Sequence, residues 1–329
     1  MRKSCYAHVL PALGALVLLV SSARAADPGL LYPPGSEIND QKAGSVLVYN
    51  LYTSGATPAT ENSRISLTNH NSNLSAFVRV FFVNGASGLA INLFICLSVN
   101  QTKVILASDI DPGVRGYIIA VAVNGSTGCP INFNFLSGDA YVKLSTGHAA
   151  NFSAEAVTAI AANPTSCVAG STTATLSFNG TNYNQLPRVL AADKIRSPAD
   201  NNALLLILNR IGGNLSTGMS TLGTINGELF NDLGNSFPFT FAAGATQRVQ
   251  VLSNTFPVTS PVFSSVIPAG RTGWMTLTSA SDIGLLGALI NFNPNAATNA
   301  TAFNGGHNLR KLTLSTTNSI TMPVAPPMC

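Results

Sequence analysis

Short strand-like runs, separated by turn residues, extend along the chain and restrict what it can fold into. Examples are SVLVYNLY (45–52), SAFVRVFFV (75–83), GYIIAVAV (116–123), ALLLILN (203–209) and QRVQVLS (247–253). These runs are rich in β-branched and aromatic residues and are bounded by Gly, Pro, Asn and Asp, which is typical of strands joined by tight turns. Strands at this spacing favour antiparallel sandwiches, so the sequence predicts an all-β fold.

A turn-and-strand phrase occurs twice in the chain. SDIDPGVRGYIIAV (108–121) is echoed by SSVIPAGRTGWMTL (264–277). Further echoes join 131–134 to 290–293 and 147–148 to 306–307, and looser ones join 45–55 to 202–213 and 67–82 to 229–241. We interpret these echoes as a tandem duplication of one domain of roughly 120–150 residues.

The echoed phrase predicts the same corner in both copies. Proline sets φ for a tight turn, and a following glycine accepts positive φ before the next strand begins. An aromatic residue opens that strand, and we expect it to pack in the core or in the corner. The corner residues are Pro112, Gly113 and Tyr117 in one copy and Pro268, Gly270 and Trp274 in the other.

The expected architecture is two tandem antiparallel β-sandwich domains, Ig-like or jelly-roll-like, with a short helix in their connection. SAEAVTAIAA (153–162) has good helix formers, Ser153 as an N-cap and Asn163-Pro164 as a stop. The expected segments are a signal peptide (1–25), a first domain (26–152), a connection with helix and hairpin (153–200) and a second domain (201–329).

The N-terminus has the features of a secretory signal. Arg2 and Lys3 precede an apolar stretch over 9–20, and Ala23-Arg24-Ala25 is a small-x-small cleavage site. No later run approaches the roughly 20 apolar residues of a membrane helix, so we expect no membrane insertion after cleavage. Removing Arg2, Lys3 and Arg24 from the 17 basic residues leaves 14 against 13 acidic ones, which argues against a nucleic-acid partner.

Cysteine usage agrees with export. Four cysteines follow the signal segment, and an even count in an exported chain predicts two disulfides with three connectivities. We prefer Cys96–Cys129 within the first half and Cys167–Cys329 closing the second. No CxxC pair occurs, so the sequence gives no indication of a zinc or redox-active site.

Two longer segments carry a resemblance. They are YNQLPRVLAADKIRSPADNNALLLILNRIGG (183–213) and GGHNLRKLTLSTTNSITMPVAPP (305–327). Together with the echoes, they resemble a group of exported bacterial tandem β-sandwich proteins of uncharacterised function. The resemblance implies an exported bacterial β-protein and transfers no catalytic residue.

Few side chains in the sequence are placed for chemistry. Asp109 and Asp111, with Asp139, form a calcium candidate because Ca²⁺ takes carboxylate oxygens; the alternative is that each caps its own turn. Calcium is the one cofactor candidate. For the repeated His148 and His307 we expect packing or turn roles.

The motifs of common enzymes are absent from the sequence. It contains no G-x-S-x-G, H-E-x-x-H, Walker or G-x-G-x-x-G motif, and we assign no catalytic residue. The leading expectation is an exported non-enzymatic structural or interaction protein, acting at the bacterial cell surface, outside the cell or in the periplasm, with a protein or glycan partner. The alternatives are a pair of carbohydrate-binding modules or a secreted hydrolase. Exposed aromatics would favour sugar binding, and the candidates are Tyr49, Tyr52, Tyr117, Tyr141, Tyr183 and Trp274.

Overall fold

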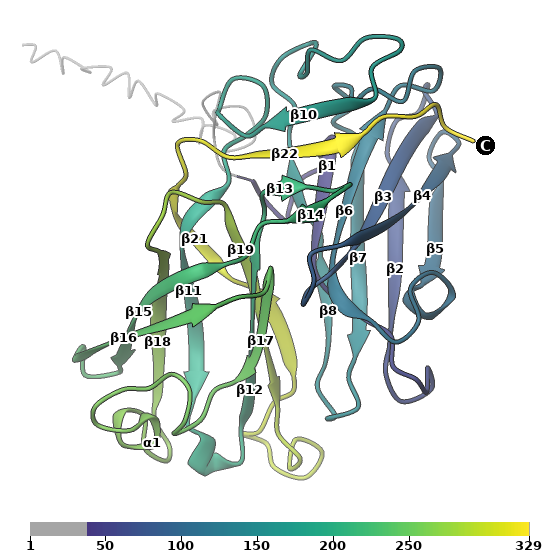
Figure 1. The fold of residues 1–329 in the computed structure, drawn as a ribbon. Coiled ribbons are helices and arrows are strands. Elements are labelled where there is room, and N and C mark those ends of the chain that lie inside the picture. Colours follow the sequence, from purple (N-terminus) through teal and green to yellow (C-terminus); the bar gives the residue numbers. More distant parts are fainter. Residues whose placement is uncertain (1–37, 329) are drawn as a thin grey trace, which may run out of the picture. The chain divides into compact units, whose positions relative to one another are not determined.

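The computed structural model describes residues 38–328, which belong to one compact unit, Pro34–Cys329. The expected signal peptide (1–25) and Cys329 lie outside the described residues. The unit is almost entirely β-structure (Figure 1). Its helical turns are η1 (Ala107–Asp109), η2 (Pro198–Asp200) and the four-residue α1 (Phe263–Val266).

Two sheets come from the first half of the chain. Sheet 1 has the order β4-β3-β6-β1-β9, formed by β1 (Val46–Thr53), β3 (Ala76–Asn84), β4 (Ala90–Leu97), β6 (Arg115–Val123) and β9 (Glu155–Val157). Sheet 2 has the order β5-β2-β7-β8, formed by β2 (Asn62–Asn69), β5 (Thr102–Leu106), β7 (Leu136–Lys143) and β8 (Ala149–Ser153).

Two further sheets come from the second half, and the fifth combines distant segments. Sheet 3 is β16-β15-β18-β11-β21, formed by β11 (Pro187–Arg196), β15 (Gly223–Asn231), β16 (Ser236–Ala243), β18 (Thr272–Ser279) and β21 (Arg310–Leu314). Sheet 4 is β17-β12-β19-β20, formed by β12 (Ala203–Arg210), β17 (Gln247–Val251), β19 (Leu285–Phe292) and β20 (Gly305–Asn308). Sheet 5 is β10-β22-β13-β14, formed by β10 (Thr173–Ser177), β13 (Gly213–Asn214), β14 (Gly218–Met219) and β22 (Ser319–Pro323).

The prediction of two tandem β-sandwich domains is wrong. Five small sheets, the number in a five-bladed β-propeller, make up the described part of the chain. The hydrophobic core also crosses the expected domain border, because Ile207 and Ile290 are buried in one cluster with Leu47 and Phe82. Short apolar strands indicate burial but do not specify which distant strands share that burial, so the sequence pattern missed this continuity.

The helix expected over 153–162 is also absent. Its residues continue β8 into β9, and Val157 pairs with Val46 of β1. Glu155 is fully buried there and forms an ion pair with Lys311 (Oε2 to Nζ, 2.8 Å). Pairing with an adjacent buried strand outweighs the modest helix propensity of Ala and Glu.

Sheets 1 and 3 have matching strand orders, and so do sheets 2 and 4. In this correspondence β1 matches β11, β2 matches β12 and β6 matches β18. The Gly-Tyr of β6 and the Gly-Trp of β18 therefore occupy corresponding places. The looser alignment of 45–55 with 202–213 is shifted by one strand, because it matches β1 with β12, whereas the strand order matches β1 with β11. The tandem duplication itself stays a prediction.

The two corners differ in what covers them. Gly113 and Gly270 both have positive φ, at 79° and 73°, as their turns require. Tyr117 is fully buried in the core, whereas Trp274 is 40% exposed and packs against Phe230 of the neighbouring strand. Tyr117 lies in a core with residues of sheet 5, such as Met322, which cover the outer face of sheet 1.

The expected disulfide pairing is wrong. Cys129, after β6, is bonded to Cys167, before β10, across a sequence separation of 38. This bond excludes both Cys96–Cys129 and Cys167–Cys329. Cys96 is also disulfide-bonded. Cysteine spacing leaves all three connectivities open, and the pairing depends on how sheet 5 packs against sheet 1.

The carboxylate of Glu61, beside β1, makes the stability of the fold depend on pH. Burial alone would raise the pKa of Glu61, but hydrogen bonds from Thr53, Arg115 and Ser145 outweigh burial and lower it to about 2. An unfolded glutamate has a pKa of about 4.3. The stabilisation by Glu61 is therefore complete above that pH and is lost as the pH falls towards 2. We expect Glu61→Gln to flatten the fall in Tm between pH 4.5 and 2, measured by circular dichroism. Glu228→Gln is the control and should keep the wild-type slope.

Candidate binding site

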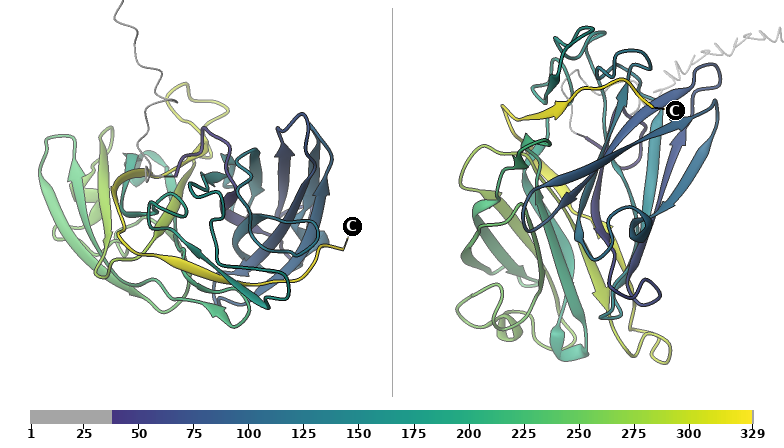
Figure 2. Two further views of the ribbon diagram at one scale, coloured as in Figure 1. Left: turned by 90° about the horizontal axis from the view of Figure 1, so that it is seen from above. Right: turned by 45° about the vertical axis from the view of Figure 1, so that its right-hand side comes forward.

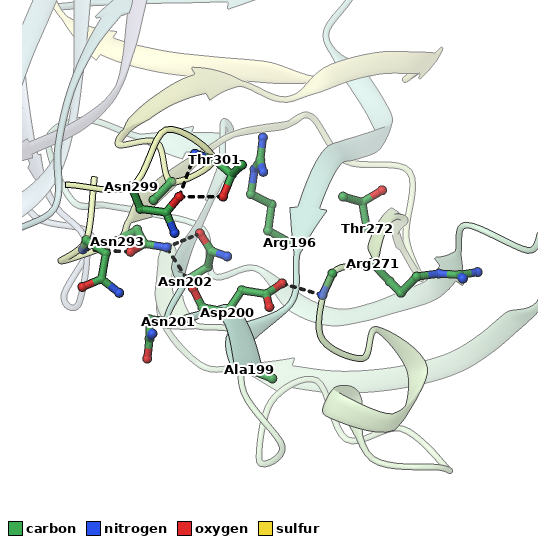
Figure 3. Close-up of a pocket in the computed structure, with 13 residues that line it drawn as sticks. Arg196, Ala199, Asp200, Asn201, Asn202, Arg271, Thr272, Asn293, Asn299 and Thr301 are labelled. Carbon is green, nitrogen blue, oxygen red and sulfur yellow. Dashed lines mark hydrogen bonds between the residues drawn. The ribbon is translucent and has the colours of Figure 1, made fainter. Parts of the chain in front are cut away.

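A polar cavity of about 550 Å³ lies where β11 ends and β18 begins (Figure 3). The η2 turn forms its base, the 293–302 loop forms one wall, and residues 270–272 form the other. Five asparagines, two threonines, two arginines and one aspartate are among its lining residues. Such a lining presents mainly hydrogen-bonding groups.

The base of the cavity is held by local hydrogen bonds. Ser197 caps η2 by accepting from the backbone N–H of Ala199 at 3.2 Å. Asn201 ends η2 in the left-handed conformation, with φ 62°, which asparagine tolerates better than most residues. Asp200 then accepts from the backbone N–H of Gly270 at 2.8 Å and ties η2 to the corner before β18.

Two buried amides fix the loop wall. Asn293 Nδ2 donates to the backbone oxygen of Asp200 (2.9 Å) and to Asn202 Oδ1 (3.1 Å). Asn202 in turn donates to the backbone oxygen of Ser197 at 3.1 Å. Both amides are buried, so the cavity is formed before any ligand binds. A preformed site avoids much of the ordering cost of binding.

The two arginines have different roles. Arg271 is turned away from the cavity (Figure 3). It forms an ion pair with Asp232 (Nε to Oδ2, 2.5 Å). Arg196 has no ion pair within residues 38–328, and its guanidinium lies 5.5 Å from the ring centre of Phe303, an exposed residue of the adjoining recess. Arg196 therefore brings a guanidinium without an ion-pair partner beside an aromatic ring, in a cavity whose one carboxylate is that of Asp200.

A smaller recess of about 160 Å³ adjoins the cavity and shares Arg196. His307 lines it and contacts Asp193 (Nε2 to Oδ1, 2.7 Å). Burial lowers the pKa of His307 and outweighs the opposing effect of Asp193, so the imidazole is neutral at neutral pH. Asn291 Oδ1, also on the recess, is buried and accepts no hydrogen bond within the described residues.

The calcium candidate is not assembled. Asp111 accepts from Tyr52 (2.5 Å), Asp139 accepts from Ser66 (2.6 Å), and Asp109 is exposed in η1. Across residues 38–328, no group of three or more His, Cys, Asp or Glu side chains is placed to hold a metal ion. Asp111 and Asp139 serve the hydrogen bonding of neighbouring strands, so the calcium interpretation has no geometric support.

The other histidines have defined contacts. His148 is buried and donates Nε2–H to the backbone oxygen of Ala203 (2.9 Å). His70 is hydrogen-bonded to Ser137 Oγ at 2.5 Å, beside a recess of about 450 Å³ that includes Asp139. No hydrogen bond joins His70 to a carboxylate in the described chain, so a Ser–His–Asp relay is not formed.

The aromatic candidates divide into buried and exposed sets. Tyr49, Tyr52, Tyr117 and Tyr183 are buried. Tyr141 and Trp274 are 42% and 40% exposed, respectively. Trp274 stacks on Phe230, with ring centres 4.2 Å apart and an angle of 9° between planes. Exposed aromatic surface therefore exists, but at fewer positions than the sequence allowed.

Comparisons with known proteins add no assignment. No family model, no curated protein and no solved structure matches this chain. Between residues 38 and 328, no helix is long and apolar enough to cross a membrane. The sequence reasoning did not single out the cavity, although its residues lie in the asparagine-rich stretches 200–202 and 291–301. Asparagine is also common in ordinary turns, so that signal was ambiguous.

Proposed function

We propose that this chain is an exported, non-enzymatic interaction protein whose ligand is a glycan. The observation that carries the proposal is the preformed cavity of amides and hydroxyls beside Arg196 and Phe303. Amides and hydroxyls both donate and accept, which matches the closely spaced hydroxyls of a sugar. An aromatic rim can cover the apolar face of a sugar ring.

The unpaired guanidinium of Arg196 favours an acidic glycan, with its carboxylate bound away from Asp200. Arg196 has no carboxylate partner in the described chain, and a guanidinium pairs with a carboxylate through two parallel hydrogen bonds. Lys194 lies next to it on the neighbouring recess and adds a second positive charge. A uronic acid residue meets both requirements, because it carries a carboxylate and several hydroxyls.

An extracellular location fits this proposal. The disulfide Cys129–Cys167 is of a kind that persists in oxidising compartments. The signal-like N-terminus and the low content of charged residues, 9%, agree with it. A fold with these sheets hosts many functions, so the proposal depends on the cavity and not on the architecture.

Binding of the mature chain to an array of acidic and neutral polysaccharides tests the proposal. We expect binding to uronate-containing polymers, and Arg196→Ala should weaken it about tenfold by removing a charge-assisted pair. Arg196→Lys should lie between, since lysine keeps the charge and loses the paired geometry. Added salt should weaken the wild type more than Arg196→Ala.

Lys103→Ala is the matched control, because Lys103 is an exposed cation on β5 and outside the cavity. It should bind as the wild type does. Absence of binding to every polysaccharide on the array, with a protein partner recovered instead, would overturn the glycan proposal.

A further inference from the structure

We propose that the binding surface continues from the cavity onto the outer face of sheet 3, where Trp274 stacks against the ligand. The ligand is then a chain of linked sugars and not a single sugar. This inference rests on the proposed function and deepens it by naming a polymeric ligand.

Matching positions in sheets 1 and 3 show what is unusual about this face. Tyr117 pairs with Val83 in sheet 1, and Trp274 pairs with Phe230 in sheet 3. Further along the strands, Ile119 and Val121 of sheet 1 match Thr276 and Thr278 of sheet 3, which pair with the next outward residues of β15. The face of sheet 1 is apolar and covered by sheet 5.

The corresponding face of sheet 3 has hydroxyls where sheet 1 has aliphatic side chains. Its outward residues on β15 include Asn226 and the carboxylate Glu228, and Thr240 on β16 donates to the Asn226 amide at 3.0 Å. Of these positions, only that of Tyr117 keeps an aromatic residue in sheet 3, where Trp274 pairs with Phe230. Covering this exposed aromatic surface with a ligand would be favourable in water. Figure 2 shows β15, β16 and β18 on the side of the unit away from β2–β5.

The cavity and the aromatic pair share one strand. Thr272 lines the cavity and lies two residues before Trp274 on β18. Side chains two apart on a strand face the same side and are about 7 Å apart. Both are exposed, whereas Met275 on the opposite face is buried. The cavity therefore opens directly onto the stacked pair, without a change of face.

Phe230 covers one face of the Trp274 indole, which leaves the opposite face for a ligand. Their ring planes are 9° apart and their centres 4.2 Å apart, so the two rings stack instead of meeting edge to face. Threonine hydroxyls at 272 and 276 lie before and after Trp274 on the same strand face. A ring stacked on an indole, with hydroxyl partners on both sides, is the arrangement that suits a sugar within a chain.

The tryptophan itself provides the experiment, because the sequence contains one tryptophan. We expect the emission of Trp274 to shift when the mature full chain is titrated with the polysaccharide that binds most tightly on the array. Calorimetry with its two-unit and six-unit fragments measures affinity independently. Trp274→Ala should weaken binding of the six-unit fragment about tenfold and leave the two-unit fragment unchanged.

Two control variants keep the outcome readable. Trp274→Phe should retain most of the affinity, and Tyr141→Ala, at an equally exposed aromatic on sheet 2, should retain all of it. Calorimetric binding without a change in emission, or equal affinity of Trp274→Ala and wild type for the six-unit fragment, would overturn this inference and leave the proposed function standing. No binding of any glycan would overturn both.

Discussion

Replacing Gly116 with alanine should destabilise the protein by about 3 kcal/mol or more, because the new methyl group would overlap backbone. A Cβ at this position would lie 1.8 Å from the backbone oxygen of Val83 on the neighbouring strand. No rotamer change relieves this overlap, since the obstructing atom belongs to a paired strand. Chemical denaturation of the variant, followed by circular dichroism, measures the loss.

The matching glycine of sheet 3 provides a second test of this close approach between strands. Gly273→Ala should also destabilise, because its Cβ would lie 2.3 Å from the backbone oxygen of Phe230. Gly244→Ala is the control, since its Cβ would meet no atom within 4 Å and its φ is not positive. A Gly116→Ala protein with wild-type stability would contradict the close approach of β3 and β6.

The sequence predicted this corner well because its physics is local. The turn depends on a Pro, a Gly with positive φ and a Gly-aromatic pair that opens the next strand. All of these residues lie close together in the sequence, so the turn can be predicted from them. In each sheet the glycine pairs with the first residue after a shift in strand register. Gly116 pairs with Tyr52 in sheet 1, and Gly273 pairs with Ile195 in sheet 3. All-β content followed from the same local patterns.

The arrangement of the sheets could not be read from such patterns. Cys129 and Cys167 meet because sheet 5 packs on sheet 1, which no cysteine spacing reports. For the same reason Trp274 is exposed and Tyr117 is buried, although their local sequences are alike. Residues 153–157 form strands because β1 offers a partner. These outcomes depend on long-range packing, which local propensity does not encode.

The candidate site was less predictable than the fold. Its two arginines and five asparagines come from three separate segments of the chain, and no spacing rule links them. The acidic residues that were singled out, Asp109, Asp111 and Asp139, serve turns and strand contacts instead. Composition indicates only that a chain poor in charge exposes mainly amides and hydroxyls, and it does not locate a site.

Replacing Asn50 with alanine should cost about 2–4 kcal/mol, because Asn50 is the centre of a buried amide network. Its Nδ2 donates to the backbone oxygen of Gly287 (3.2 Å) and to Asn308 Oδ1 (2.9 Å), while Asn209 Nδ2 donates to its backbone oxygen (2.9 Å) and to its Oδ1 (3.2 Å). Gln247 donates to Asn209 Oδ1 at 2.8 Å and extends the network.

The network joins β1 of the first half to β12, β17 and β20 of the second, so its loss should also loosen their contact. Truncating Asn50 leaves Asn308 Oδ1 without its donor in a buried site. The free-energy penalty of an unpaired buried acceptor exceeds the net stabilisation that the hydrogen bond provided. We expect a lower denaturation midpoint and faster hydrogen exchange in β12 and β20. Asn235→Ala, at an exposed amide whose side chain has no hydrogen bond within residues 38–328, should change neither. Equal stability of the two variants would show that the halves are held together by apolar packing alone.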